Sequence, residues 1–291
     1  MRVTENMTYR NLLAGAGALQ ENIETASQQV STGRKILSLA DSPSGSAELV
    51  SLRSQLAEVD QYRTSGNSGG YFVGLAESIL SSANDVVTSI YTRGSAGATS
   101  YWDPNERAAL ASEIRTLRDQ LLSLANSTAN GRYLFAGSRV TAAPFTLSGD
   151  QVSYGGDLVQ NMISVGDGLD VKQNVPGSTT FGAAFDAVTS LLAALEAGDV
   201  AALSAVLGQF SGALRDISAA RVDLGVSSAA IQGAGSEQDA RETALRSRQG
   251  IIEDADLAEA ITRMKSNESA LNATFAARAL VGQRNLFDYL A

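Results

Sequence analysis

Acidic side chains gather just ahead of the C-terminal stretch and are the first candidates for chemistry. The cluster comprises Glu253, Asp254, Asp256 and Glu259. Because carboxylate oxygens are the ligands that Ca²⁺ and Mg²⁺ prefer, one interpretation is a divalent metal site. The other is that acids at the start of a long helix complement the positive end of its dipole. We favour the second interpretation and predict no metal at this cluster.

No other motif in the chain supports catalysis. Asp167–Asp170 lacks the alternating acidic spacing of a calcium loop and fits a turn better. Gly15–Gly17 and Gly233–Gly235 are not followed by the Gly-Lys-Ser/Thr of a phosphate loop, so these glycines are expected to let helices approach closely. The chain has no His and no Cys, so its serines lack an imidazole to activate them. The sequence therefore predicts no catalytic residue, no cofactor and no enzyme activity.

Composition points to closely packed helices. The 291 residues suffice for two or three domains, and 44% are apolar although only 6% are aromatic. The net charge is −9, the isoelectric point is near 4.6, and no cluster of Lys and Arg offers a track for phosphates, so we expect no nucleic-acid partner. The N-terminus lacks the apolar core of a cleavable signal peptide, and no apolar run approaches membrane length. We therefore expect no membrane insertion.

An apolar stripe runs over residues 251–290. Its members, spaced as on one face of a helix, are Leu257, Ile261, Met264, Leu271, Phe275, Ala279, Leu286 and Leu290. No Pro interrupts the stretch, and a single helix over it would be about 60 Å long. A helix with so thin a stripe needs partners, because propensity alone does not stabilise it in water.

A matching seam lies at the opposite end of the chain. Its members, which alternate in steps of four and three, are Leu12, Ala16, Leu19, Ile23, Ala26 and Val30. This is the a/d spacing of a coiled coil, so residues 1–43 and 252–291 are predicted to form a terminal helical pair and an assembly interface. The seam's burial contributes about 6–12 kcal/mol against roughly 20–40 kcal/mol of backbone entropy. We therefore expect the pair to become ordered on assembly or on capture by a chaperone.

Between the two ends, residues 44–132 and 183–251 are predicted to form an elongated helical bundle. Asp41–Pro43 and Asp103–Glu106 each combine a capping side chain with an early Pro, which predicts a helix start. Neither half has a self-contained core, so the two halves are expected to pack on each other.

Three glycine-containing segments are candidates for helix breaks. Ser65–Gly70 has the composition of a loop, with an uninterrupted helix as the alternative. A break is also predicted at Gly94–Gly97. The helix that starts near Asp103 is predicted to close at Asn130–Gly131.

The helical period disappears between residues 133 and 182. Short apolar pieces such as Val152–Tyr154 and Met162–Val165 alternate with turn residues at Ser148–Asp150 and Gly166–Gly168. This pattern predicts a β-rich inserted domain.

Helices are predicted to resume at Ala183. Because the character changes at both borders, the segment Phe135–Phe181 is expected to be replaceable by a short linker. The predicted fold is mainly α with a small β insert: long terminal helices in a coiled-coil pair, an elongated helical bundle and a β-rich outer domain.

Several motifs, in this order along the chain, resemble those of the flagellin superfamily. They are Met1–Thr4, Tyr9–Leu13, Leu37–Ser46, and Gly131–Gly137 followed by Pro144–Phe145. Three further motifs, Tyr154–Asp157, Asn174–Gly177 and Leu286–Leu290, are similar to the hook-associated branch of that superfamily. The resemblance spans the whole chain, although Asp41–Ser42 stands where flagellins usually have an acidic pair.

The resemblance implies a structural subunit of the bacterial flagellum that joins hook to filament. It implies terminal helices in the inner wall of a tube, self-assembly into a helical or ring layer, and another hook-associated protein and flagellin as neighbours. It also implies an extracellular location, type III export without a cleaved signal peptide, and a cytosolic chaperone at the C-terminal helix. Two alternatives stay open: a flagellin filament subunit, and a secreted surface-binding module with the β insert as its active part.

Overall fold

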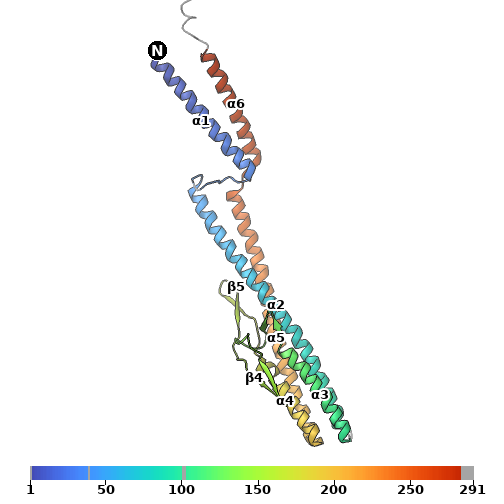
Figure 1. Cartoon of the computed structure of the whole chain (residues 1–291). Coiled ribbons are helices and arrows are strands. Elements are labelled where there is room, and N and C mark those ends of the chain that lie inside the picture. The colour runs from blue at the N-terminus through green and yellow to red at the C-terminus, as the bar shows by residue number, and fades with distance from the viewer. Residues whose placement is uncertain (1, 39, 100–102, 283–291) are drawn as a thin grey trace, which may run out of the picture. The chain divides into compact units, whose positions relative to one another are not determined.

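The computed structural model describes residues 2–38, 40–99 and 103–282, and within them it contains six helices and three two-stranded antiparallel sheets (Figure 1). Contacts divide the chain into two compact units. Unit 1 is Met1–Glu58 with Arg241–Ala291, and unit 2 is Val59–Ala240. The predicted fold class, mainly helical with small antiparallel sheets, is confirmed.

Unit 1 is built around two terminal helices that lie side by side, α1 (Arg2–Thr32) and α6 (Leu257–Gly282). Helix α1 ends at Thr32, and the next residue, Gly33, has a φ of 71°, a conformation that glycine adopts without strain. The next helix, α2 (Pro43–Thr99), begins at the predicted Pro43, and the Ser42 hydroxyl accepts a hydrogen bond from the Gly45 N–H at 3.2 Å.

One helix does not extend over residues 251–290, because the chain leaves the helical conformation after Glu253, and residues 283–290 lie outside the described part. The fifth helix, α5 (Val200–Glu253), ends at Glu253, and α6 begins only at Leu257. Asp256 explains the new start, because its Oδ1 accepts hydrogen bonds from the N–H groups of Ala258 and Glu259 at 2.9 and 3.1 Å. The N–H of Ala255 meanwhile donates to the Gly33 carbonyl at 2.9 Å instead of continuing a helix.

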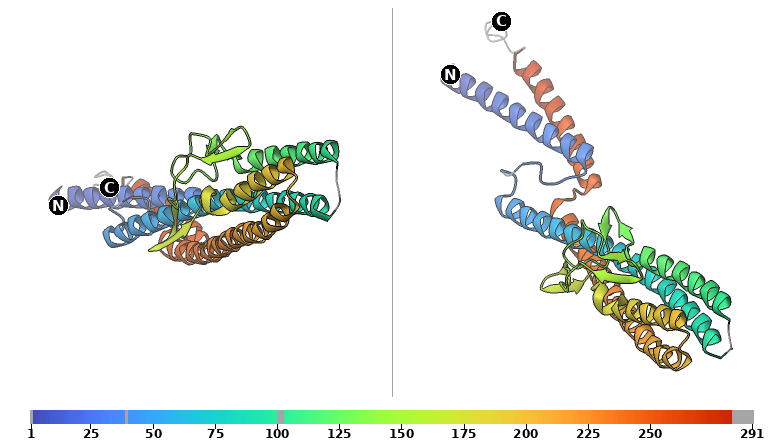
Figure 2. Two further views of the ribbon diagram at one scale, coloured as in Figure 1. Left: turned by 90° about the horizontal axis from the view of Figure 1, so that it is seen from below. Right: turned by 60° about the horizontal axis from the view of Figure 1, so that its bottom comes forward.

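Unit 2 packs α3 (Pro104–Ala125) and α4 (Gly177–Ala197) side by side with α2 and α5 (Figure 2). The predicted start of α3 is confirmed by a capping box between Asp103 and Glu106. Its predicted end is wrong, because α3 stops at Ala125 and Asn130–Gly131 forms a hairpin turn. Both turn residues have positive φ, 51° and 74°, as this dipeptide readily does.

At Ser65–Gly70 the structure has the uninterrupted helix that was the alternative to a loop, and the predicted break at Gly94–Gly97 is wrong, since α2 runs through both segments. A Cβ added at Gly69 would lie 1.9 Å from Cδ1 of Ile163. One added at Gly94 would lie 2.9 Å from Cδ2 of Leu191. These glycines therefore let neighbouring elements approach the helix, at a local cost of about 1 kcal/mol each.

We expect Gly69→Ala to lower the free energy of unfolding of unit 2 by about 1–3 kcal/mol, because the added methyl overpacks against Ile163. Gly74→Ala in the same helix is the matched control, since nothing lies within 4 Å of its added Cβ. That control should stabilise by about 0.5–1 kcal/mol through helix propensity. Urea unfolding followed by far-UV circular dichroism measures both. Equal effects of the two changes would contradict the packing role of Gly69.

The segment between α3 and α4 consists of three hairpins. The strand pairs are β1 (Thr128–Ala129) with β2 (Arg132–Tyr133), β3 (Phe145–Ser148) with β4 (Gln151–Tyr154), and β5 (Met162–Gly166) with β6 (Leu169–Lys172). The predicted turns at Ser148–Asp150 and Gly166–Gly168 are confirmed. Helix α4 resumes at Gly177, earlier than the predicted Ala183, because Pro176 supplies the extended entry into the helix.

This β segment shares its core with the helices. The ring of Phe181 in α4 packs 5.0 Å from that of Phe135 and 5.9 Å from that of Phe145, centroid to centroid. All three side chains are buried in one cluster with residues of α2, α3, α4 and α5. This shared core argues against the expectation that Phe135–Phe181 can be replaced by a linker, since removal would uncover part of the helical core.

Among the described residues, α4 is long and apolar enough to pass a length-and-composition test for a membrane span. This differs from the expectation that no apolar run approaches that length. However, 56% of this apolar stretch of α4 is buried within unit 2. Burial in the core of unit 2 accounts for the apolar character of α4.

Candidate assembly interface

The N-terminal seam lies against α6 within unit 1. Ala26 is buried, and the other seam residues are half-buried: Leu12, Ala16, Leu19, Ile23 and Val30. From α6, Ala260 is buried, and Met264 and Leu271 are half-buried. The structure thus brings the N-terminal seam together with part of the C-terminal stripe.

The rest of the C-terminal stripe faces outward. Leu257, Ile261 and Phe275 are 46%, 42% and 49% exposed, and we call these three residues the outer stripe. They lie at spacings of four and fourteen residues on one face of α6, beside the face that meets α1. Beside Phe275, a shallow hollow is lined by Tyr9, Leu12, Leu13, Ala16, Thr274 and Phe275. The side chain of Ala279, and Leu286 and Leu290 altogether, fall outside the described side chains.

The terminal pair has little core of its own. Among the described side chains of α1 and α6, only Ala26, Gln29 and Ala260 are buried. By contrast, all the largest fully buried side chains of the chain as described lie in unit 2. The pair therefore presents apolar surface that further burial would stabilise.

A polar cluster joins the two linkers of unit 1, the first linker at residues 33–42 and the second at residues 254–256. Glu253 is 5% exposed, and its carboxylate contacts Nε of Arg34 at 3.1 Å and Nη2 of Arg53 at 3.0 Å. Nε2 of Gln249 donates to the same carboxylate at 2.7 Å. Buried Gln29 donates from Nε2 to the Lys35 carbonyl at 3.2 Å and accepts from Nη2 of Arg263 at 3.1 Å.

The structure gives the acidic residues near the second linker two different roles. Asp256 caps α6, as the dipole interpretation requires. Among the described residues no three or more acidic side chains are grouped closely enough to form a metal site. The role of Glu253 was missed. The sequence carried no signal for it, because only the structure shows that Glu253 ends α5, where a carboxylate is unfavourable for the helix dipole and is compensated by Arg34 and Arg53.

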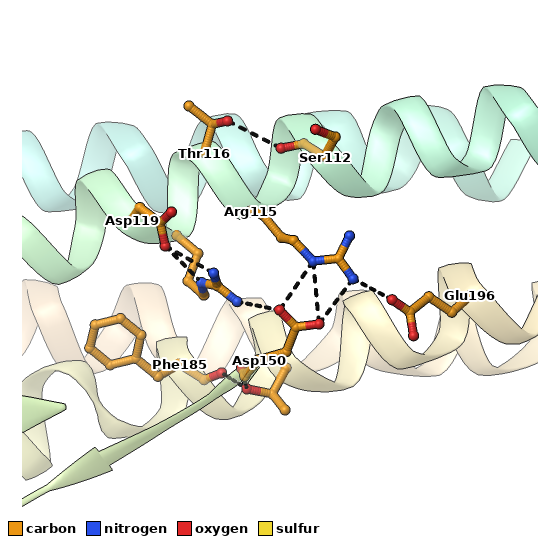
Figure 3. Close-up of polar contacts among 9 residues, drawn as sticks. Ser112, Arg115, Thr116, Asp119, Asp150, Phe185 and Glu196 are labelled. Atoms are coloured by element: carbon orange, nitrogen blue, oxygen red, sulfur yellow. Dashed lines mark hydrogen bonds and ion pairs between the residues drawn. The ribbon is translucent and has the colours of Figure 1, made fainter. Parts of the chain in front are cut away.

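In unit 2, a second polar cluster fastens the β3–β4 hairpin to the helices (Figure 3). The carboxylate of Asp150, in the hairpin turn, accepts from Nε and Nη2 of Arg115 at 3.1 and 3.0 Å and also contacts Arg118. The Arg118 side chain is only 5% exposed. The Thr189 hydroxyl of α4 donates to the Asp150 carbonyl at 3.1 Å. Hydrogen bonds from Arg115, and next from Arg118, hold the pKa of Asp150 below its ordinary value although burial opposes them.

Two family models match most of the chain. The bacterial flagellin N-terminal helical region matches residues 3–140, and the bacterial flagellin C-terminal helical region matches residues 207–290. Among curated relatives, the flagellar hook-associated protein 3 of Escherichia coli K12 is 29% identical over 65% of this chain and 58% of its own length. That of Salmonella typhimurium LT2 is 32% identical over 50% of this chain and 46% of its own. The chain thus spans about half the length of these curated relatives.

Flagellin FlaB1 of Treponema pallidum is 22% identical over 92% of this chain and 91% of its own. Among solved structures, a putative flagellar hook-associated protein from Vibrio parahaemolyticus superposes with a TM-score of 0.68 at 18% identity, covering 73% of this chain and 99% of that one. A hook-associated protein 3 from Legionella pneumophila gives 0.62 at 16% identity, covering 68% and 96%. These structures share the fold, and with both terminal helical regions matched, the chain belongs to the flagellin family.

Proposed function

We propose that this chain is a structural subunit of the bacterial flagellum that joins the hook, through another hook-associated protein, to the flagellin filament. The observation that carries the proposal is the terminal pair, which has little core of its own and exposes the outer stripe of α6. The two relatives named hook-associated protein 3 support the junction role in particular. A filament subunit is the alternative, supported by the lower-identity match that extends over most of FlaB1.

In this proposal the seam of α1 and the apolar stripe of α6 form the assembly interface. Copies of the chain associate into a ring or helical layer through the terminal pair, formed by residues 1–43 with 252–291. The helices of residues 44–132 and 183–251, with the first turns of α4 from Gly177, form the outer helical domain, and the hairpins within residues 133–182 form the β-rich part farthest from the tube axis. The subunit lies outside the cell after type III export without a cleaved signal peptide, and a cytosolic chaperone covers the C-terminal helix before export.

The proposal predicts that Ile23→Asp and, separately, Leu271→Asp abolish attached filaments in cells whose own copy of the subunit is absent. Each change puts a carboxylate on an apolar face, Ile23→Asp on the seam of α1 and Leu271→Asp on the stripe of α6. Assembly would bury this carboxylate at a cost of several kcal/mol per subunit. Both side chains are only half-buried in the chain as it stands, so the melting temperature of the purified protein should shift by less than about 4 °C. Electron microscopy of cells and the amount of filament protein in the medium measure the loss.

Leu158→Asp is the matched control, since Leu158 is an exposed apolar residue of the β segment and receives the same charge. It should leave attached filaments at the wild-type number. Wild-type numbers for both seam variants would show that the seam is not the assembly interface. A sharp fall in their melting temperature would show that the seam belongs to an ordinary core.

A further inference from the structure

The two linkers of unit 1 are hydrogen-bonded to each other as well as connecting helices. The Lys35 N–H donates to the Glu253 carbonyl at 2.6 Å, and the Ala255 N–H donates to the Gly33 carbonyl at 2.9 Å. These bonds make a short antiparallel bridge in which Arg34 faces Asp254. The bridge lies where α1 stops and α6 is about to start.

Glu253 is the side chain that holds this bridge in place. Its carboxylate is nearly buried, and it contacts Arg34 of the first linker and Arg53 of α2. Both guanidinium groups are more than half exposed, so water solvates the cations while the anion is enclosed. An enclosed anion that keeps two charge-assisted contacts costs far more to leave unpartnered than either exposed cation does.

We propose that Glu253 is a positioning residue, a latch that fixes the two linkers against each other and so sets the axial register in which α1 and α6 are presented for assembly. Register matters because each residue advances a helix by about 1.5 Å, so an axial slip of about two residues would set the seam side chains against the wrong turn of the partner helix. Gln29 acts with the latch, because it ties α1 to Lys35 and, through Arg263, to α6. This inference rests on the proposed function, since register is needed only if the pair assembles.

Glu253→Gln in the full chain tests the latch, because it keeps the shape of the side chain and removes its charge. We expect amide exchange at Lys35 and Ala255 to become about tenfold faster, and trypsin to cut more rapidly after Arg34 and Lys35. The melting temperature should stay at the wild-type value, because the large buried side chains lie in unit 2. Attached filaments should become few.

Glu237→Gln is the matched control, because Glu237 is an exposed carboxylate of α5 that lies in unit 2, outside the linkers and their partners. It should leave exchange, proteolysis and filaments unchanged. Arg34→Ala is a second variant, whose exposed side chain can be removed without disturbing the fold. It should accelerate the same two amides by about threefold, since Arg53 still contacts Glu253.

The outcomes separate the latch from the proposed function. Exchange rates in Glu253→Gln that equal those of Glu237→Gln would overturn the latch. Faster exchange with a normal number of attached filaments would overturn its role in assembly and leave the proposed function standing. If the unmodified chain itself does not restore filaments, the proposed function falls, and the exchange comparison alone then decides whether Glu253 holds the linkers.

Discussion

Replacing Phe181 by alanine is expected to lower the free energy of unfolding of unit 2 by about 3–5 kcal/mol, the largest stability loss we predict. Phe181 has no exposed surface, and its ring packs against Phe135, Phe145 and Phe185. Truncation would leave a cavity at the contact between α4 and the β segment, where rings from both sides already fill the space. At about 2–4 °C per kcal/mol for a unit of this size, the melting temperature should fall by roughly 6–20 °C.

Phe275→Ala is the natural comparison, because it removes the same side chain from the half-exposed outer stripe of α6. Thermal and urea unfolding of that variant should match the wild type within about 0.5 kcal/mol. If Phe181→Ala proved equally mild, the β segment would be an independent appendage instead of part of the shared core.

Asp150→Asn is expected to lower the free energy of unfolding at neutral pH by about 2–3 kcal/mol. The change removes the carboxylate that neutralises Arg118, whose side chain is almost fully buried. Loss of one partner of a buried ion pair costs about 3–5 kcal/mol. We expect a smaller loss of stability here because Arg118 keeps its contact with Asp119. Urea unfolding of the two proteins at pH 7 measures the difference.

The same carboxylate makes stability depend on pH in a defined direction. The folded-state pKa of Asp150 is lowered from 3.8, so its contribution is complete above that value and disappears as the pH falls through the folded-state pKa. The gap between wild type and Asp150→Asn should therefore be present at pH 7 and shrink below about pH 4. Asp167→Asn, at the exposed tip of the β5–β6 hairpin, should show no gap at either pH. A gap of constant size down to pH 2 would exclude the ion pair as its source.

Local signals in the sequence predicted local structure well. The caps at Ser42 and Asp103 and the hairpin turn at Ser148–Asp150 each depend on residues within one turn of the chain. The a/d seam of α1 was equally readable, because a seven-residue period needs no knowledge of the rest of the fold.

The errors came from interactions between residues far apart in the chain. A glycine at position 69 is compatible with a loop and also with a helix against which Ile163 packs closely. Only the position of β5 in the folded chain distinguishes these two alternatives. The same holds for Glu253, because Arg34 and Arg53 come near it only after α1, α2 and α5 have packed. The apolar spacing of the candidate interface could be predicted from the sequence. The contacts that Glu253 makes with Arg34 and Arg53 could not.

The shared aromatic core has a practical consequence for placing tags in this protein. Foreign sequence inserted near Phe135, Phe145 or Phe181 would split the packing that holds the helices together. The tip of the β3–β4 hairpin is also unsuitable, because Asp150 is clamped by two arginines. Asp167, at the tip of the β5–β6 hairpin, is exposed, and its backbone does not share the left-handed conformation of Gly168, whose φ is 66°. An epitope or a dye-accepting cysteine placed there would label the subunit from outside while its core and its terminal pair stay intact.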